Sequence, residues 1–459
     1  MPTIAETLKN SALDNVRTAL QKARDNESYH AFLTLTEARA LERAKLVDEG
    51  KLSGRLAGVP FVVKDNFLAF GAPTTAASKI LENFEAPLQA TVVERLEAEG
   101  AICIGKANMD AFAHGSSTEN SAFGPTKNAT DPSKVAGGSS GGSAVVTALD
   151  IVPFALGSDT GGSIRQPASF NGVVGVKPTY GMTSRYGVIA MASSTDVMGC
   201  FTRTVADAEL VLSVMAGQDA RDMTTLPDYF SPITTLSEPQ RIGVIREFMT
   251  DDVDEEVRQH TLEYIERLKA AGHMVEEVSL PIAKYTLAMY YIIVPAEVSS
   301  NLARYDGIRY GIRSSAAKTL SEVYGMSRDA GFVPENKRRI MIGSFVLSSG
   351  FFDAYYLKAQ KARTLLIQEL NALFNDYDFL LSPTVPSPAF AFGENTDDPI
   401  KMYLSDAMTV GASLAGIPAL SVPAGLTEAG LPVGVQLMAP RKADASLLAL
   451  AKSMEENNG

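Results

Sequence analysis

The sequence predicts an α/β fold, a central mixed twisted sheet covered on both faces by helices. Short β-branched apolar runs alternate along the chain with segments whose apolar residues recur at helical spacing. The chain has 459 residues, of which 46% are hydrophobic and 20% charged, which is enough to bury a large core. No internal repeat, low-complexity linker or long charge run divides it. We therefore expect one large domain spanning residues 1–459, rather than several independent ones.

The N-terminal segment, residues 1–50, is expected to be helical. Residues 3–47 are polar, contain neither glycine nor proline and carry apolar side chains at helical spacing, which predicts two helices with a break near residues 26–29. The run Val59-Pro60-Phe61-Val62-Val63 then predicts a buried strand that ends at Lys64. A helix over 91–99 leads into a strand over 101–104. These elements are expected to form the first part of an α/β core.

The core region is expected over residues 51–230. Its part from 115 to 187 is rich in Gly, Ser and Thr, and such small residues allow backbone N–H groups to approach a ligand closely. A strand–helix–strand unit follows, with strands over 242–245 and 274–278 and a helix over 253–271. The pattern over 285–373 is mainly helical, and we expect it to form the substrate pocket. Strands return over 379–381, 419–422 and 433–437.

Composition excludes several classes of protein. A net charge of −12 disfavours an extended nucleic-acid-binding face, which needs clustered Lys and Arg. The longest apolar run, 144–156, is broken by Asp150 and is too short to span a bilayer. The N-terminus has acidic residues where a signal or transit peptide would not. Two cysteines suit a reducing compartment. We expect a cytoplasmic protein without a membrane segment.

The sequence contains few residues of the types that bind metals, and histidine, the usual base in acyl transfer, is scarce. The chain has four histidines, and it lacks both H-E-x-x-H and C-x-x-C. We therefore expect no metal site. Any base for acyl-transfer chemistry has to be found among other residue types.

Two glycine motifs invite other interpretations. The run from Gly100 to Ala107 nearly matches a phosphate-binding P-loop, but Ala107 stands where a Ser or Thr has to hold magnesium, and the intervening residues are typical of a strand. The stretch Gly138-Ser-Ser-Gly-Gly142 fits G-x-S-x-G with Ser140 as the nucleophile. That interpretation needs a later histidine, and His260 and His273 both lie in positions typical of a helix surface.

A third motif, Gly157-Ser-Asp-Thr-Gly-Gly-Ser163, is chemically more promising. Consecutive N–H groups at its glycines can form an anion-binding nest suited to the oxyanion of a tetrahedral intermediate, with Ser163 placed for attack. Lysine is able to act as its base once burial lowers the lysine pKa from about 10.4 towards about 7. Lys64, at the end of a buried strand, is the candidate. The alternative is that Lys64 forms a structural ion pair with Asp65.

Three elements in register resemble the amidase signature family. They are Lys64, the stretch Gly137-Gly-Ser-Ser-Gly-Gly-Ser143, and the stretch from Gly157 through Ser163 to Pro167. The resemblance implies the amidase-signature fold and a Ser–cisSer–Lys triad with Ser163 as nucleophile, Ser139 as relay and Lys64 as base. It also implies a cis peptide bond before Ser139. The oxyanion hole is expected from the backbone at Thr160, Gly161, Gly162 and Ser163.

Outside this core the chain resembles the glutaminase subunits of tRNA-dependent amidotransferases, a branch of the same family. The stretches 115–127, 295–307, 337–340 and 347–350 carry this likeness. It implies that an arginine holds the carboxylate of glutamine and an aspartate its ammonium. The matching positions are Arg339, with Arg338 as a competitor, and Asp406, while Tyr290 or Tyr291 lines the pocket. A fork of N–H donors suits a carboxylate, although each charge is also compatible with an ordinary helix surface.

The chain departs from that pattern in four places. Ala111 and His114 stand where Glu and Met are usual, Cys200 stands where Pro is expected, and the C-terminus is short. None of these changes removes a member of the expected triad. The surroundings of His114 are nevertheless expected to pack differently.

The resemblance implies a glutaminase that supplies ammonia for converting Glu-tRNA(Gln) to Gln-tRNA(Gln), with Asp-tRNA(Asn) as a further candidate substrate. Its partners would be the amidotransferase subunits B and C in a heterotrimer. The tRNA would be reached through the B subunit, which would also use ATP and Mg, and no cofactor is expected in this chain. Two alternatives stay open: a free-standing amidase acting on a small amide, and a scaffold without activity.

Overall fold

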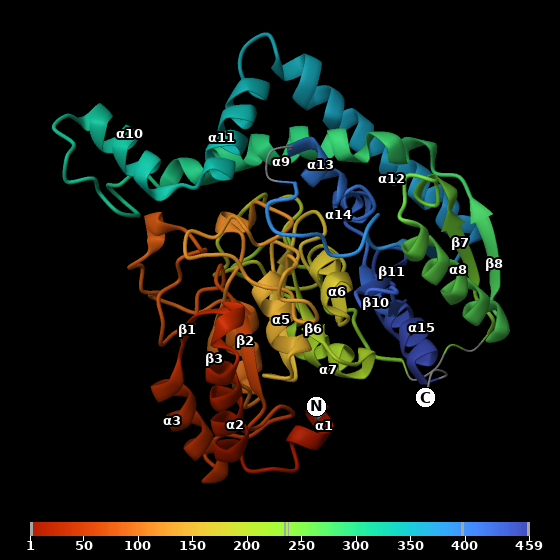
Figure 1. Cartoon of the computed structure of the whole chain (residues 1–459), viewed down its shortest axis with the longest axis horizontal. Helices are drawn as coiled ribbons and strands as arrows, with labels where there is room; N and C mark the ends of the chain where they lie inside the picture. Colours follow the sequence, from red (N-terminus) through yellow and green to blue (C-terminus); the bar gives the residue numbers. More distant parts are fainter. Residues whose placement is uncertain (1–2, 234–235, 237, 396–398, 457–459) are drawn as a thin grey trace.

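All strands belong to one mixed sheet in the computed structural model, which describes residues 3–233, 236, 238–395 and 399–456 (Figure 1). The sheet has eleven strands in the order β1-β3-β2-β4-β6-β5-β10-β11-β9-β7-β8. Pairing is parallel for β2 with β3 and β4 and for β7 with β8 and β9, and antiparallel elsewhere. The strands are β1 (Phe32–Leu35), β2 (Pro60–Lys64), β3 (Ile102–Ala107), β4 (Phe154–Asp159), β5 (Val174–Lys177), β6 (Val197–Thr202), β7 (Arg241–Ile245), β8 (Met274–Val278), β9 (Phe379–Pro383), β10 (Ala419–Leu426) and β11 (Pro432–Met438).

Helices cover both faces of this sheet, as predicted. Successive side chains of a strand point to opposite faces, and β2 shows where each face packs. Phe61 and Val63 join a core cluster with residues of α4 and α7, whereas Val62 joins another with residues of α2 and α5. The helices are α1 (Ile4–Thr7), α2 (Ala12–Asp25), α3 (Glu37–Asp48), α4 (Thr91–Ala98), α5 (Gly141–Ala148), α6 (Arg165–Asn171), α7 (Val205–Met215), α8 (Glu255–Ala270), α9 (Thr286–Asn301), α10 (Leu320–Gly331), α11 (Pro334–Val346), α12 (Lys358–Asp376), α13 (Pro399–Leu404), α14 (Val410–Ala415) and α15 (Asp444–Glu456).

The region from α9 to α12 is helical, as predicted, and lies together along the upper edge of the molecule in Figure 1. A six-residue π-helix, Phe352–Leu357, leads into α12. Helices α9 and α11 approach closely because Gly343 of α11 faces the backbone of Pro295 in α9, where a methyl group would overlap the Pro295 carbonyl oxygen. This contact fixes α11 next to the site described below.

Four strands, β1, β4, β5 and β6, were not predicted from the sequence. Residues 3–47 contain β1 between α2 and α3, so the prediction of two helices across this segment was wrong at Phe32–Leu35, which pairs antiparallel with β3 at the edge of the sheet. β6 lies between β4 and β5 and pairs with both. Among the described residues, no helix is both long and apolar enough to cross a membrane.

Candidate active site

Lys64 is a fully buried lysine at the carboxyl end of β2. It follows Val62 by two residues, so its side chain lies on the face of the sheet that α5 covers. Its Nζ lies 2.7 Å from Ser139 Oγ, 3.0 Å from Ser158 Oγ and 3.4 Å from the Ser158 carbonyl oxygen. Burial lowers the pKa of Lys64 to about 7, against the opposing charges of Asp110, Asp159 and Asp196. Two N–H groups and one lone pair of a neutral amine match these three oxygen contacts.

Ser139 sits in the turn that precedes α5. The Gly138–Ser139 peptide bond is cis, as the resemblance implies. Ser139 is fully buried, and its carbonyl oxygen accepts from the N–H of Asp110 at 3.2 Å. Gly138 is required here, because a Cβ at this position would overlap the carboxylate of Asp110 and lie 2.7 Å from the Ser117 nitrogen. Close backbone packing therefore holds the Ser139 hydroxyl against Lys64.

Ser163 lies in the loop between β4 and α6, and its side chain is nearly buried. The N–H groups of Thr160, Gly161 and Ser163 form no hydrogen bond within the described part of the chain. The N–H of Gly162 donates to Asp159 Oδ1 at 2.9 Å, so its expected role in the oxyanion hole stays a prediction. Gly162 has a φ of +136°, a conformation that favours glycine. Three N–H donors of the Ser163 loop are therefore free of bonds to the described chain.

Asp159 anchors this loop. Its carboxylate accepts from the N–H groups of Gly162 and Ile164 and forms a buried ion pair with Arg165, Nη2 to Oδ1 at 2.9 Å. Burial opposes the ionisation of Asp159, but the charge and hydrogen bonds of Arg165 outweigh it and lower the pKa of Asp159 to about 2. The carboxylate thus stays charged and fixes the backbone on both sides of Ser163.

Arg339 is buried on α11 rather than exposed on a helix surface. Its Nε donates to Glu335 Oε1 at 2.8 Å, and its guanidinium lies over the rings of Tyr291 and Tyr403, 4.9 and 5.4 Å from their centroids. Those two rings stack with centroids 3.9 Å apart. Arg338 is 44% exposed and pairs with Glu335, so the geometry favours Arg339 as the interior cation.

Asp406 lies on the other side of Tyr291 and is also buried. The hydroxyl groups of Tyr291 and Ser116 donate to its carboxylate, at 2.8 Å and 2.9 Å. Burial raises the pKa of Asp406 to about 6, although both hydrogen bonds act in the opposite direction. The interpretation of Arg339 and Asp406 as helix-surface charges is therefore wrong.

Tyr290 connects this cluster to the Ser163 loop. Its ring packs edge-on against Tyr291 with centroids 5.1 Å apart. A Cβ added to Gly161 would lie 2.5 Å from the Tyr290 ring, so Tyr290 covers the backbone of the loop directly. Thr409, three residues after Asp406, donates to the Gly161 carbonyl oxygen at 2.6 Å. The pair of charged residues and the reactive loop thus form one continuous site.

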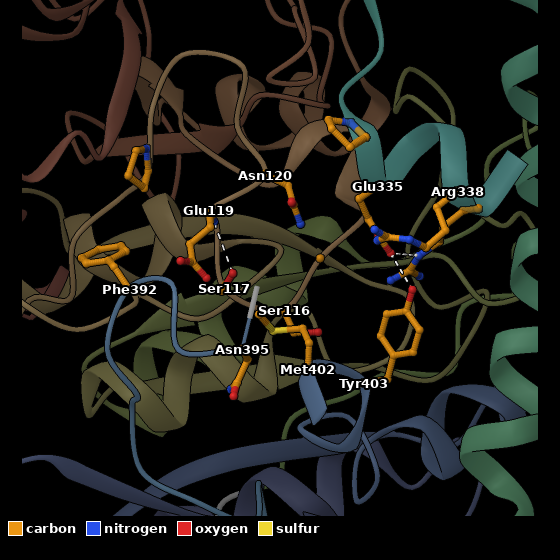
Figure 2. Close-up of a pocket in the computed structure, with 14 residues that line it drawn as sticks. Ser116, Ser117, Glu119, Asn120, Glu335, Arg338, Phe392, Asn395, Met402 and Tyr403 are labelled. Carbon is orange, nitrogen blue, oxygen red and sulfur yellow. Dashed lines mark hydrogen bonds and ion pairs between the residues drawn. The ribbon is translucent and has the colours of Figure 1, made fainter. Parts of the chain in front are cut away.

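A cavity of about 440 Å³ opens next to this cluster (Figure 2). Ser116, Arg339 and Tyr403 line it, and Figure 2 shows Tyr403 and Arg338 directed towards Glu335. The described residues that line it do not include Lys64, Ser139 or Ser163. The cavity therefore borders the Arg339 side of the site, and Ser163 does not line it.

The competing interpretations of the motifs are wrong. Asp65 pairs with Lys106, 3.3 Å away, instead of with Lys64. Most of the run from Gly100 to Ala107 forms the buried strand β3, which begins at Ile102, and not a phosphate-binding loop. Ser140 donates to the Ser158 carbonyl oxygen, while His260 and His273 bond to backbone groups elsewhere in the described chain.

Several contributors were missed from the sequence. Ser158, which contacts Lys64, lies inside the Gly157–Ser163 motif, near the carboxyl end of the buried strand β4. Ser116, Tyr403 and Glu335 carry no such signal, since they act through contacts between distant segments. Cys200 is a buried residue of β6. No group of three His, Cys, Asp or Glu residues in the described ranges is placed to hold a metal ion.

Comparison with known proteins shows the family of this chain. The family model described as Amidase matches residues 14–448, and the chain belongs to the amidase family. It is 50% identical over 455 residues to the A subunit of glutamyl-tRNA(Gln) amidotransferase from Gloeobacter violaceus, covering 97% of this chain and 93% of the relative.

Two solved structures are also similar to this chain over nearly its whole length. The crystal structure of the A subunit of glutamyl-tRNA(Gln) amidotransferase from Thermotoga maritima matches with a TM-score of 0.83 at 39% identity, covering 99% of this chain and 94% of that one. A bacterial aryl acylamidase of the amidase signature enzymes matches with a TM-score of 0.87 at 25% identity, covering 99% and 96%.

Proposed function

We propose that this chain is the glutaminase component of a tRNA-dependent amidotransferase. The observation that carries the proposal is the pair of buried opposite charges, Arg339 and Asp406, held on either side of Tyr291. A free α-amino acid presents a carboxylate and an ammonium group on one carbon, and this pair matches both. A substrate that lacks these two groups would leave Arg339 with Glu335 as its counter-charge and Asp406 with no cationic partner among the described residues. The similarity to A-subunit relatives at 50% identity supports the same assignment.

The chemistry begins with attack by Ser163 on the side-chain amide of glutamine. The Ser163 hydroxyl passes its proton to Ser139, whose own proton goes to neutral Lys64, 2.7 Å away. The carbonyl oxygen becomes an oxyanion, and the free N–H groups of Thr160, Gly161 and Ser163 stabilise it. The Gly162 N–H holds the loop by donating to Asp159. It becomes a fourth donor to the oxyanion only where the oxyanion displaces the Asp159 carboxylate.

The intermediate then collapses. Lys64 returns its proton through Ser139 to the amide nitrogen, the C–N bond breaks, and ammonia leaves with its pair of electrons. Water next attacks the glutamyl ester of Ser163 with Lys64 again as the base, which releases glutamate and restores the serine. The net reaction converts glutamine and water to glutamate and ammonia.

Ammonia is the product that the wider reaction uses. Because of the similarity to A-subunit relatives, we place the chain in a heterotrimer with subunits B and C. The B subunit would activate Glu-tRNA(Gln), with Asp-tRNA(Asn) as a further candidate, and would use ATP and Mg to do so. A division of labour of this kind explains how a chain with a net charge of −12 serves a tRNA reaction.

Ammonia release from glutamine tests the proposal, measured for wild type, Ser163→Ala and Lys64→Ala with and without co-purified partner subunits. We expect partner-stimulated release that both variants lose. Strong partner-independent release from unrelated amides would instead support a free-standing amidase, the alternative that the fold shared with the aryl acylamidase favours. Release that survives Ser163→Ala would contradict the assigned nucleophile.

A further inference from the structure

His114 and Asn336 form a buried link between the loop that carries Ser116 and the helix that carries Arg339. Both side chains are fully buried. The Asn336 Nδ2 lies 2.8 Å from His114 Nδ1 and 2.8 Å from the Ala111 carbonyl oxygen. The Asn120 side chain donates to the His114 carbonyl oxygen at 3.2 Å, which ties the same loop from the other side.

The contacts fix the form of the imidazole. The atom next to the Ala111 carbonyl oxygen has to be the amide nitrogen of Asn336, because an amide oxygen there would face another acceptor. The same nitrogen meets His114 Nδ1, which must therefore accept the hydrogen bond through its lone pair. The proton sits on Nε2, and the ring is neutral. Burial and the nearby charge of Arg339 hold the pKa of His114 well below its usual value, which agrees.

The part of the link that the His114 ring supplies depends on one acceptor position, next to the Asn336 bond to the Ala111 carbonyl oxygen. His114 Nε2 and Asn336 Oδ1 are buried and form no hydrogen bond with any described residue. The only side-chain connection made by the His114 ring in the described chain is thus Nδ1 to Asn336. A residue that supplies an acceptor at the Nδ1 position preserves the connection, and a residue that lacks one breaks it.

Both ends of the link adjoin the charges of the site. His114 precedes Ser116 by two residues, and Ser116 donates to Asp406. Asn336 and Arg339 are three residues apart in α11, which places them on the same face of that helix. A second connection, from Ser78 to the Gly331 carbonyl oxygen, joins the core to the end of α10 rather than to α11.

We propose that His114 is a positioning residue for substrate binding: through Asn336 it sets the position of α11 against the 114–116 loop, and so the spacing between Arg339 and Asp406. The inference rests on the proposed function, in which the substrate is an amino acid. Arg339 binds its carboxylate and Asp406 binds its ammonium group, so the distance between the two residues has to match the substrate. The 114–116 loop and the Asn336–Arg339 face of α11 together act as a clamp of fixed width.

The test measures kcat and KM for glutamine in the complex with its partner subunits, for three substitutions of His114. Asn places its side-chain oxygen near the position of imidazole Nδ1, whereas Gln reaches the position of Nε2 and Met supplies no comparable acceptor. We expect His114→Gln and His114→Met to raise KM for glutamine by about fivefold or more with kcat within about twofold, and His114→Asn to restore KM to within about twofold of wild type. His273→Gln is the matched control, since His273 Nδ1 also accepts a hydrogen bond, from the Gln240 N–H, remote from the site.

A second variant covers the case in which a substitution disturbs folding. In an Asn336→Ala background, His114→Met should have no further effect on KM, because the link is already broken. Wild-type KM in both His114→Gln and His114→Met would overturn the inference alone, and so would a fall in kcat without a change in KM, or a defect in His114→Asn as large as in the others. Absence of ammonia release by the wild-type complex would overturn the proposed function and this inference together.

Discussion

In the proposed mechanism, catalysis depends first on one residue, Lys64, whose pKa lies near physiological pH. The pKa of Lys64 falls to about 7 because its side chain is fully buried and the nearby carboxylates compensate only in part. Only the neutral amine can accept the proton from Ser139. We therefore propose that the buried lysine at the end of β2 takes the place of the histidine that usually serves as the base.

The pH dependence follows from the sign of this shift. Below pH 7 the protonated fraction of Lys64 grows, so ammonia release should fall about tenfold for each pH unit well below 7, pass half its maximum near 7, and level off above it. Initial rates at saturating glutamine, measured from about pH 5.5 to about pH 9, check this. A rate that does not change across this interval would rule out Lys64 as the base.

Asp159 illustrates a residue whose role is to hold the reactive loop. In Asp159→Asn the buried guanidinium of Arg165 loses its charged partner, and the free energy of unfolding should fall by about 3–5 kcal/mol. Ammonia release should fall as well, because the Gly162 and Ile164 N–H groups lose a charged acceptor. Denaturant unfolding measures the first effect. Asp251→Asn, which breaks an exposed pair with Arg258, should leave stability almost unchanged, and equal behaviour of the two variants would contradict the argument.

Among the secondary-structure elements, α9 and α11 determine where Arg339 lies. Gly343→Ala should push these helices apart, because the new methyl group would overlap the Pro295 carbonyl oxygen. We expect a loss of roughly 1–3 kcal/mol in the free energy of unfolding and a raised KM for glutamine.

Gly325→Ala in α10 is the control, since nothing lies within 4 Å of its added Cβ. It should stabilise the protein by up to about 1 kcal/mol, because Ala is the better helix former, and leave KM unchanged. Thermal or denaturant unfolding with glutamine kinetics distinguishes the two. A Gly343→Ala variant with wild-type KM would show that the α9–α11 contact does not position Arg339.

Elements were predictable from the sequence where their pattern is local. The strand at β2, the helix at α8 and the strands of β7 and β8 follow from short-range periodicity, and the structure confirms them. β1 was missed because four half-buried residues between two helices carry no strong alternation and gain their order from pairing with β3. β6 contains Gly199, whose missing side chain makes room for the Val176 carbonyl oxygen of β5, a requirement invisible before the strands are paired.

The candidate site shows the same distinction between local patterns, which the sequence reveals, and contacts between distant segments, which it does not. Lys64, Ser139 and Ser163 could be proposed from the sequence because each belongs to a stretch of adjacent residues that resembles the family pattern. The contacts of Ser116 and Tyr291 with Asp406, and of Tyr403 with Arg339, join segments that lie far apart in sequence. The engagement of the Gly162 N–H by Asp159 depends on backbone geometry that a motif does not specify.

In the molecule as a whole, one eleven-stranded sheet connects the reactive loop with the helices that carry Arg339 and Tyr291. We propose that the chain works as a single domain, in which residues 51–230 supply the reacting groups and the helical region over 285–373 supplies these two residues. Release of ammonia without a nearby acceptor would waste glutamine, so we expect the glutaminase activity to depend on the partner subunits.

The proposed reaction requires that Ser163 forms a glutamyl ester, and direct trapping of that ester tests it. The complex is mixed with glutamine, quenched in acid during turnover, digested and mapped by mass spectrometry, with Ser163→Ala, Lys64→Ala and Ser140→Ala treated in parallel. We predict a glutamyl adduct on the peptide that contains Ser163 in wild type and in Ser140→Ala, and none in the other two. An adduct on Ser139 or Ser140, or one that persists in Ser163→Ala, would contradict this mechanism.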